Sequence, residues 1–365
     1  MKRIALIPGD GIGAEVTRQV EKVLARLGDR DGPGIRIESF DLGADRYLET
    51  GVAITEAEMA RLESDFDAIF LGAIGDPRVP DNEHGRAVLL GLRFRLDLYI
   101  NLRPARLFEP WLSPLRDVRC EDVDLVIFRE NTEGIYAGMG GQLRRGTPHE
   151  VAIEEDINTR RGVERIVRAA FDHARRCGRR RVTLTDKANA MPHTGGLWRR
   201  VFAEVGAEFP GIEQDAVYAD ALALDLVRRP ARYDVIVAPN LFGDILSDLA
   251  AALVGGLGLA PSANLHPGRP GLFEPVHGSA PDIAGTGRAN PIAALLTAAL
   301  MLDQLGRVAE AGRLEAAVRS ALRQRRVTPD LGGSLSTDAL GDWIADEMIR
   351  LTPIHEPEHG HAASA

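Results

Sequence analysis

Residues 234–250 read Asp-Val-Ile-Val-Ala-Pro-Asn-Leu-Phe-Gly-Asp-Ile-Leu-Ser-Asp-Leu-Ala, and this stretch holds the pattern that decides the fold. Its first part, 234–238, is a short apolar run that is typical of a buried strand. The residues after Pro239 place apolar side chains around a helix, so we expect that helix to be largely buried. A buried strand that leads directly into a buried helix is the repeating unit of α/β proteins with a mostly parallel sheet.

The same alternation of strand and helix recurs along the chain. Strands are expected at residues 4–7, 35–40, 66–71, 124–128 and 181–185. Helices are expected at residues 14–27, 56–63, 158–175 and 194–204, and from 291 to 322 with breaks at Gly306 and Gly312. This order predicts the α/β class, in which helices cover a mostly parallel sheet.

Two stretches, 249–263 and 291–302, are the most apolar of the chain, and we interpret them as buried helices. Gly, Pro or Asp interrupts each of them before it reaches the roughly 20 residues that a membrane span needs. The C-terminal residues 352–365 hold Pro, Gly, Ser and three histidines without an apolar period, so a disordered, solvated tail is expected there.

The composition is that of an acidic globular protein that folds without disulfides. The chain has 365 residues, a formal net charge of −9 and two cysteines, and 45% of it is hydrophobic. At roughly 150 residues per domain, about two domains are expected. The charge argues against a general nucleic-acid binder, and two thiols fit a reducing cytoplasm better than a secreted, disulfide-bonded scaffold.

Two carboxylates, Asp244 and Asp248, are four residues apart on the buried helix and therefore share one face of it. Stacked acids repel each other unless a cation lies between them. Oxygen ligands favour Mg²⁺ or Mn²⁺ over zinc, and Asp220 could supply a third ligand. From spacing alone, two solvated acids on a surface stripe remain the alternative.

Lys187 is an unusual residue in this chain, because 41 of the 44 basic residues are arginine and only Lys2, Lys22 and Lys187 are lysine. A GC-rich genome explains the bias in general. Lysine can lose its proton in a protein whereas arginine practically cannot. Lys187 is therefore a candidate for proton transfer.

Arginines cluster around short polar loops at Arg93, Arg103 and Arg129, and guanidinium groups at strand ends suit a substrate that carries carboxylates. A second polar segment, 273–291, is a long Gly- and Pro-rich loop that could bring backbone N–H groups and a histidine to a nucleotide. Residues 9–13 lack the full G-x-G-x-x-G pattern, so a Rossmann dinucleotide site is not expected.

Taken together, these segments resemble the β-decarboxylating dehydrogenases, which include 3-isopropylmalate, isocitrate, homoisocitrate and tartrate/D-malate dehydrogenases. The resemblance covers about residues 1–350. It rests on IPGDGIG at 7–13, LDLYINLRPAR at 96–106, FRENTEGIYAG at 128–138, DKANAM at 186–191, NLFGDILSDLA at 240–250 and EPVHGSAPDIAGTGRANP at 274–291. So many long motifs in the same order are specific to this family.

The resemblance implies an isopropylmalate dehydrogenase-like two-domain α/β fold without a Rossmann nucleotide site. Residues 1–98 and 251–351 would form the large, cofactor-binding domain, and residues 99–250 the small domain with the dimer interface and the metal ligands. It also implies a homodimer whose active sites mix residues of both subunits.

The resemblance further implies the site residues and their roles. Asp244 and Asp248 of one subunit and Asp220 of its partner would bind Mg²⁺ or Mn²⁺. Arg93, Arg103 and Arg129 would bind the malate carboxylates, and Tyr136 would form the proton-transfer pair with Lys187 of the partner subunit. The cofactor-binding residues implied are Ile12, Gly72, Ala73, His277, Gly278, Ala280, Asp282 and Asn290.

The implied reaction is the oxidative decarboxylation of a 3-substituted (2R,3S)-malate to a 2-oxo acid and CO₂, in the cytoplasm. NAD is the expected cofactor, because the Asp282 carboxylate suits a free ribose 2′-hydroxyl and would repel a 2′-phosphate. Arg288 is an objection, since it could reach a phosphate, although a surface position suits it too.

The 3-substituent is where the resemblance leaves alternatives open. Leu89 and Leu90 match the pair that contacts the isopropyl group in 3-isopropylmalate dehydrogenases, which favours that substrate. Arg86 stands where those enzymes usually have glutamate, and would suit a carboxylate or phosphonate substituent. The stretches 140–161 and 260–265 are similar to tartrate/D-malate dehydrogenases. A non-catalytic regulatory subunit is disfavoured, because Tyr136, Lys187 and the three aspartates are all present.

Overall fold

The computed structural model describes residues 1–28 and 34–351, and its framework is one ten-stranded sheet in the order β2-β1-β3-β12-β11-β4-β5-β10-β8-β9. The strands are β1 (Lys2–Gly9), β2 (Ile35–Ser39), β3 (Ala68–Ala73), β4 (Ile100–Arg106), β5 (Asp124–Glu130), β8 (Arg181–Asp186), β9 (Glu213–Tyr218), β10 (Val235–Ala238), β11 (Pro261–Leu265) and β12 (Gly271–Pro275). The predicted tail, 352–365, lies outside the described residues.

Both ends of the sheet are parallel, and its centre is antiparallel. Strands β2, β1, β3 and β12 run parallel to one another, and so do β5, β10, β8 and β9. The pairings β12–β11, β11–β4 and β4–β5 between these two groups are antiparallel. The prediction of a mostly parallel α/β sheet is confirmed, and the antiparallel centre is a feature that it missed.

The strand order groups the chain into two halves that meet between β11 and β4. One half of the sheet, which we call the terminal half, comes from residues before 99 and after 250. The other, which we call the middle half, comes from the residues between them. The division into two domains at those boundaries stays a prediction.

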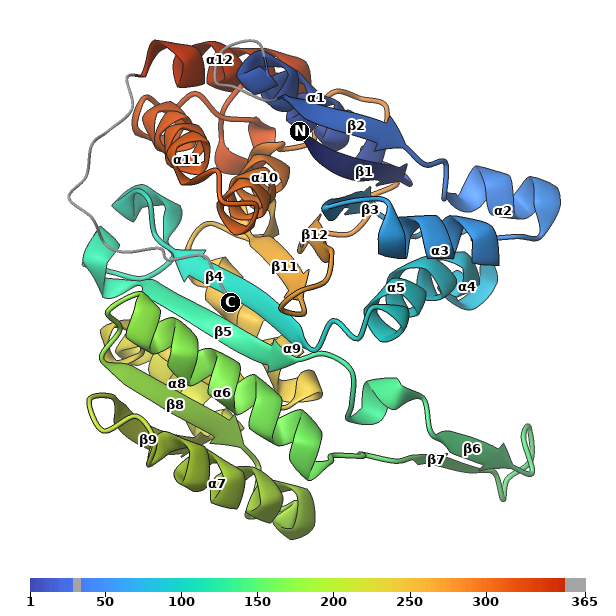
Figure 1. The fold of residues 1–365 in the computed structure, drawn as a ribbon, viewed down its shortest axis with the longest axis vertical. Coiled ribbons are helices and arrows are strands. Elements are labelled where there is room, and N and C mark those ends of the chain that lie inside the picture. Colours follow the sequence, from blue (N-terminus) through green and yellow to red (C-terminus); the bar gives the residue numbers. More distant parts are fainter. Residues whose placement is uncertain (29–33, 352–365) are drawn as a thin grey trace.

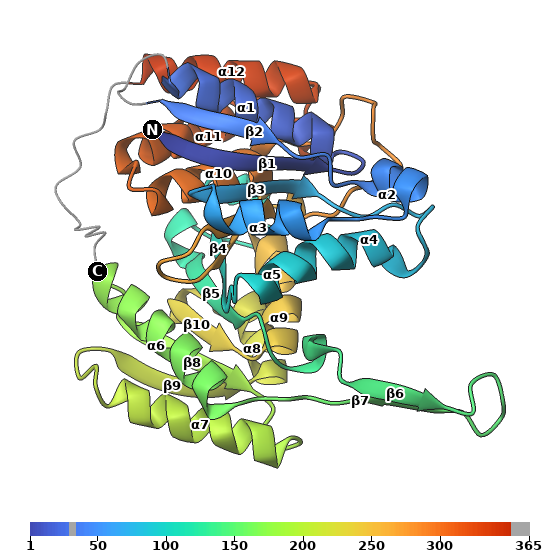
Figure 2. The ribbon, with the colours of Figure 1, turned by 45° about the vertical axis from the view of Figure 1, so that its right-hand side comes forward.

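Helices cover both faces of the sheet (Figures 1 and 2). Helices α1 (Gly13–Gly28), α10 (Ile292–Gln304), α11 (Val308–Arg323) and α12 (Thr337–Arg350) pack together beside the terminal half, whose other face carries α2 (Ala44–Thr50), α3 (Glu56–Ser64), α4 (Glu83–Gly85) and α5 (Gly91–Arg95). The middle half is covered by α6 (Arg160–Arg176) and α7 (Pro192–Gly206) on one face and by α8 (Ala219–Arg228) and α9 (Asn240–Leu253) on the other.

A two-stranded arm, β6 (Gly140–Leu143) and β7 (Val151–Glu154), extends away from the body of the molecule (Figure 2). The arm carries apolar side chains that are exposed in the single chain. Leu143 is 61% exposed and Ile153 is 46% exposed. Exposed apolar groups on a projecting ribbon are typical of a protein–protein contact.

Two sequence predictions about secondary structure are wrong. Residues 249–263 are not one buried helix: α9 ends at Leu253, and residues from Pro261 enter strand β11. Gly255 and Gly256 lie between them with φ of 117° and 98°, conformations that end a helix. Gly306, with φ of 79°, does separate α10 from α11, but Gly312 lies inside α11 in ordinary helical backbone.

We predict that replacing a large buried side chain at the centre of the terminal half with a small one strongly destabilises the protein. Phe70 of β3 is fully buried, so Phe70→Ala is expected to lower the free energy of unfolding by about 3–5 kcal/mol. Leu48→Ala on α2, where the side chain is 48% exposed, is the control and should change it by less than about 0.5 kcal/mol. Urea unfolding at one fixed protein concentration measures both, and equal losses would contradict the assignment of the core.

Candidate active site

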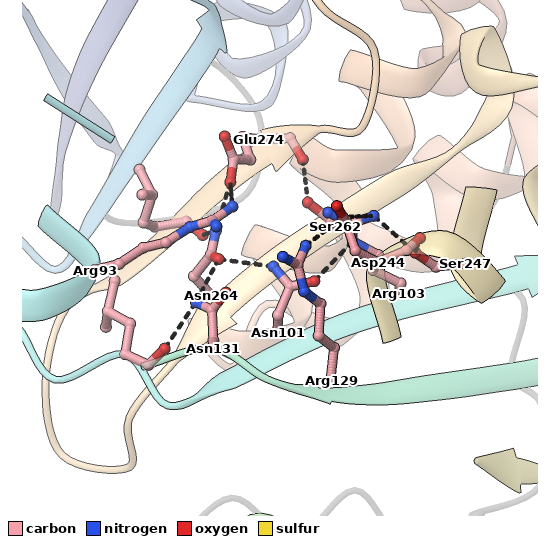
Figure 3. A network of polar contacts seen from close by, with 12 residues as sticks. Arg93, Asn101, Arg103, Arg129, Asn131, Asp244, Ser247, Ser262, Asn264 and Glu274 are labelled. Atoms are coloured by element: carbon pink, nitrogen blue, oxygen red, sulfur yellow. Dashed lines mark hydrogen bonds and ion pairs between the residues drawn. The ribbon is translucent and has the colours of Figure 1, made fainter. Parts of the chain in front are cut away.

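Three buried arginines form the centre of the candidate site. Arg93 lies on α5, Arg103 on β4 and Arg129 on β5, and their exposures are 6%, 9% and 2%. The antiparallel pairing of β4 with β5 places Arg103 and Arg129 on neighbouring strands. The pairing of β12 with β11, and of β11 with β4, brings Glu274, which binds Arg93, to the same place. Figure 3 shows the three side chains in one polar network. The structure brings Arg93, Arg103 and Arg129 together (Figure 3), and their role in binding the malate carboxylates stays a prediction.

Arg129 is held by the first turn of α9. Its Nη2 donates to Asn240 Oδ1 at 2.7 Å, its Nε to the same oxygen at 2.9 Å, and its Nη1 to Asp244. Burial lowers the pKa of Arg129, and the neighbouring charge of Arg103 lowers it further, to about 10. The guanidinium thus stays protonated at neutral pH and presents a fixed positive charge.

Arg103 connects the same helix to the strands. Its Nη1 donates to Ser247 Oγ at 2.7 Å and lies 3.3 Å from Asp244 Oδ1 and 3.4 Å from Asp248 Oδ1. Burial lowers the pKa of Arg103, and the Asp244 carboxylate opposes that shift. One guanidinium therefore bridges the two carboxylates whose spacing along the helix marked them in the sequence.

A hub at Asn264 links the arginines through amide groups (Figure 3). Asn264 Oδ1 accepts from Asn101 Nδ2 at 2.7 Å and from Asn131 Nδ2 at 2.9 Å, and Asn264 Nδ2 donates to Glu274 Oε1 at 2.9 Å. The same Glu274 oxygen accepts from Arg93 Nη2 at 2.8 Å, and Asn101 Oδ1 accepts from Arg103 Nε at 2.7 Å. The network thereby fixes Arg93 and Arg103 relative to each other.

Tyr136 faces this cluster from the short turn that follows Gly134. Its hydroxyl donates to Asp244 Oδ2 at 2.8 Å, and its ring lies 5.0 Å below the Arg129 guanidinium. Burial, then the hydrogen bond to the Asp244 carboxylate, raises the pKa of Tyr136. The phenol therefore keeps its proton at neutral pH.

The two carboxylates on α9 differ in electrostatic environment. Burial alone would raise the pKa of Asp244, but the charges of Arg129 and Arg103 outweigh burial and lower it. For Asp248 burial prevails and raises the pKa. Asp248 is 55% exposed and Asp244 34%, so both carboxylates are open on one side.

Lys187 and Asp220 form a second group. Lys187 Nζ donates to Asp220 Oδ1 at 2.6 Å, and Asp220 is exposed at the start of α8. Asp186, whose proximity to the lysine raised a question in the sequence, bonds instead to Arg199 Nε at 2.7 Å and to the N–H of Ala188. Within residues 1–28 and 34–351 of one chain, no three His, Cys, Asp or Glu side chains could hold a metal ion.

The candidate cofactor residues lie where the loop after β1 meets the loop after β12. The N–H of Ile12 donates to the carbonyl of Ser279 at 2.8 Å. Gly11 has a φ of 56°, and a Cβ there would come within 2.0 Å of that carbonyl oxygen, so the position needs glycine. Burial lowers the pKa of His277, whose Nε2 is buried without a partner among the described residues. Gly278 and Asp282 are exposed next to it, Ala280 has a left-handed φ of 39°, and Ala73 at the end of β3 is buried.

Two of the predicted cofactor residues already have structural partners. Asn290 donates to Asp330 Oδ2 at 2.9 Å and accepts at 3.0 Å from the N–H of Ile292, the first residue of α10. Gly72 is buried against β1 and α1, where a Cβ would come within 2.5 Å of the carbonyl oxygen of Pro8 and 2.7 Å of Thr17 Cγ2. Their cofactor roles stay predictions.

The substrate-selecting residues suggested by the sequence lie on one helical segment. Leu89 and Leu90 are half-buried in a π turn, Arg86–Leu90, that leads into α5 and Arg93. Arg86 starts that turn and is exposed.

Sequence reasoning missed the residues that hold the arginines: Asn101, Asn131, Asn240, Ser247, Asn264 and Glu274. Most stand inside the motifs quoted above. The signal that could have found them is a polar side chain within an otherwise apolar strand, since such a group must be hydrogen-bonded when buried.

Comparison with known proteins identifies the family. The model of the isocitrate/isopropylmalate dehydrogenase family matches residues 3–344. The chain belongs to this family. Its members are β-decarboxylating dehydrogenases, which use a nicotinamide dinucleotide and a divalent metal.

Individual relatives match nearly the whole chain. The 3-isopropylmalate dehydrogenase of Thermobifida fusca is 47% identical over 95% of this chain and 97% of its own length, and that of Beutenbergia cavernae is 49% identical over 93% and 98%. Among solved structures, an isocitrate dehydrogenase from Methylococcus capsulatus has a TM-score of 0.87 at 39% identity, covering 95% of this chain and 99% of its own. No described helix meets the length and apolarity that a bilayer crossing requires.

We predict that Glu274 stabilises the fold by balancing Arg93. Glu274→Gln keeps the shape and an oxygen for Asn264, but leaves a buried guanidinium without its counter-charge, which costs about 3–5 kcal/mol. Ser262→Ala on the neighbouring strand is the matched control, because it removes one buried hydrogen bond to the backbone of Glu274 and costs about 1 kcal/mol. Urea unfolding without ligands compares them, and a Glu274→Gln loss no larger than the control's would refute the charge argument.

Proposed function

We propose that this protein is an NAD-dependent 3-isopropylmalate dehydrogenase. The observation that carries the proposal is the match, at 47–49% identity over nearly full length, to 3-isopropylmalate dehydrogenases. The half-buried Leu89 and Leu90 beside the arginine cluster support it, because an isopropyl group needs an apolar surface next to the carboxylate-binding groups.

Arg86 favours a second candidate substrate, a malate whose 3-substituent is an anion. Arg86 is exposed at the start of the π turn that carries the leucine pair. In the first proposal it is a solvent-facing residue. D-malate or tartrate, which lack a large 3-substituent, form the third candidate class.

In this proposal the three arginines hold the two malate carboxylates. Buried, protonated guanidiniums bind carboxylates through paired N–H groups, and little reorganisation is needed because the amide network already fixes them. Tyr136, protonated at neutral pH, would give its proton to the carbon that loses CO₂. The partner's Lys187 would accept the proton of the 2-hydroxyl group.

The carboxylates fit a divalent cation, since Asp244 and Asp248 offer oxygens on one helix face and, among the described residues, Arg103 is the one positive group that bridges them. When bound, Mg²⁺ or Mn²⁺ would polarise the oxygen at C2 and NAD⁺ would accept the hydride from that carbon. Asp220 lies with Lys187 in the second group. We therefore infer a homodimer in which Asp220 of the partner subunit completes the ligand set.

The cofactor loop fits a dinucleotide, because the buried Nε2 of His277 lacks a partner in the part of the chain that the structure describes. The close contact of Gly11 with Ser279 leaves no room for a side chain there. The exposed Asp282 carboxylate beside it favours NAD over NADP, since it accepts a hydrogen bond from a 2′-hydroxyl and repels a 2′-phosphate.

We also propose the two-domain division at residues 98/99 and 250/251 and a cytoplasmic location. The two halves of the sheet meet at the β11–β4 pairing, β4 begins just after the first boundary, and α9 ends just after the second. Cys120 and Cys177 are free thiols, which suits a reducing compartment.

The test of the function is NADH formation, followed at 340 nm with Mg²⁺, on isopropylmalate, isocitrate, tartrate and D-malate. The proposal expects the highest kcat/KM with isopropylmalate. A higher value with an anionic 3-substituent would replace it with the Arg86 alternative.

We predict that two inactive variants complement each other if the active sites are shared. In a shared site, one subunit supplies Asp248 and the other supplies Lys187. Lys187→Met or Asp248→Asn therefore damages both sites of its own homodimer, and each homodimer should be inactive. Mixed dimers contain one intact site, and random mixing of equal amounts should restore about a quarter of wild-type activity. The measurement is NADH formation after joint refolding, and no recovery although mixed dimers form would contradict the shared site.

We predict that Asp282 sets the cofactor preference. Asp282→Asn removes the charge that repels a 2′-phosphate, so the NAD-to-NADP ratio of kcat/KM should fall about tenfold, since an ionic hydrogen bond contributes about 1.5–3 kcal/mol. Arg288→Ala is the control and should leave the ratio unchanged. A large loss of NADP activity in that control would instead assign phosphate recognition to Arg288.

A further inference from the structure

The segment that carries the proposed substrate-recognition residues is a run of helical turns from Glu83 to Arg95, which we call the recognition segment. Its middle is the π turn Arg86–Leu90, where the N–H of Gly91 bonds back to the carbonyl of Arg86. π turns are rare and often occur at functional sites. This turn sets the direction of Leu89 and Leu90.

The entry to the recognition segment has an unfavourable backbone. Asp81 and Asn82, neither of them glycine, take φ values of 54° and 51° in succession. Side chains crowd the backbone in this left-handed region, so such residues persist only where surrounding contacts impose the conformation. The segment therefore needs an anchor close to its start.

His84 supplies that anchor through a buried contact to the loop after β1. Its Nε2 lies 2.7 Å from Asp10 Oδ2, and the exposures of His84 and Asp10 are 1% and 8%. Since a carboxylate can only accept, Nε2 is the donor. Asp10 is itself fixed, because its two oxygens accept from the N–H groups of Ala44 at 2.6 Å and Gly75 at 2.7 Å.

The opposite end of the recognition segment has a second buried anchor, the ion pair of Arg93 with Glu274. Leu89 and Leu90 thus lie between two fixed points. The two anchors join the leucine pair to the loop after β1 on one side and to the Asn264 hub on the other.

We propose that His84 is a positioning residue for substrate selection: through Asp10 it holds Leu89 and Leu90 where they meet the 3-substituent. This inference rests on the proposed function, because it takes the leucine pair as the recognition surface. A purely structural His84 would fill volume under Tyr47, whose ring lies 5.9 Å from the imidazole at an interplanar angle of 27°.

Two variants distinguish the effect of the N–H donor of His84 from the effect of the volume of its ring. His84→Phe keeps an aromatic ring under Tyr47 but has no donor, whereas His84→Gln loses the ring but places an N–H group at similar reach. Tyr47→Phe is the control, since it keeps the ring and loses only an exposed hydrogen bond to Glu83. If the His84→Phe chain does not fold, His84→Met replaces it as the variant without a donor.

The measurement is kcat and KM for isopropylmalate, D-malate and NAD with purified dimers. For His84→Phe we expect KM for isopropylmalate to rise about tenfold and the isopropylmalate-to-D-malate ratio of kcat/KM to fall about tenfold, with KM for NAD within about twofold, as a local loss of positioning predicts. For His84→Gln, every kcat and KM should stay within about threefold of the wild-type value. Tyr47→Phe should have the kcat and KM values of the wild type.

The positioning role would be overturned if His84→Phe kept the wild-type isopropylmalate-to-D-malate ratio of kcat/KM. It would also be overturned if His84→Phe and His84→Gln lowered that ratio equally. Failure of the proposed function gives a different result, because the wild type itself would then not prefer isopropylmalate. The same ratio is in that case measured with the 3-substituted malate that the wild type prefers, and the same outcomes decide the role of His84.

Discussion

The burial of three like charges is the constraint on which the rest of the structure depends. Arg93, Arg103 and Arg129 are each more than nine-tenths buried, and burial together with the charge of a neighbouring arginine lowers the pKa of Arg103 and that of Arg129. Burying an unpaired guanidinium costs several kcal/mol, so carboxylates must come to the same place. Glu274 comes from β12 and Asp244 from α9, which means that both halves of the sheet contribute counter-charge.

This constraint explains the antiparallel centre of the sheet. In a uniformly parallel sheet, neighbouring strands would be joined by helical crossovers and present the same ends together. Here β11, β4 and β12 alternate in direction, which brings Asn264, Asn101 and Glu274 side by side across adjacent strands. Close packing completes the arrangement: a Cβ on Gly243 would come within 2.7 Å of the Arg129 side chain, so glycine lets α9 approach the strand.

The sequence could predict what local pattern determines. The strand–helix unit at residues 234–250 and the shared face of Asp244 and Asp248 follow from spacing, whereas the set of three arginines is implied by the resemblance to the family. It could not predict the hub at Asn264, because its partners are 133 and 163 residues away in the chain. Nor could it show that Lys187 bonds to Asp220 rather than to its neighbour Asp186, since Arg199 on α7, 13 residues further along the chain, takes that carboxylate.

The same arginines leave the two acids of α9 unequal. Asp244 contacts both Arg129 and Arg103, and their charges lower its pKa. Asp248 forms an ion pair with Arg103, at 3.4 Å, but burial prevails there and raises its pKa. The uncompensated negative charge of this helix face therefore lies on the outer, more exposed Asp248. Additional positive charge from outside the chain would stabilise Asp248 most, and it would do so without competing with Arg129, which keeps Asp244. In the proposed site, the buried charges that organise the fold would thus also direct an incoming cation to the exposed side of Asp248.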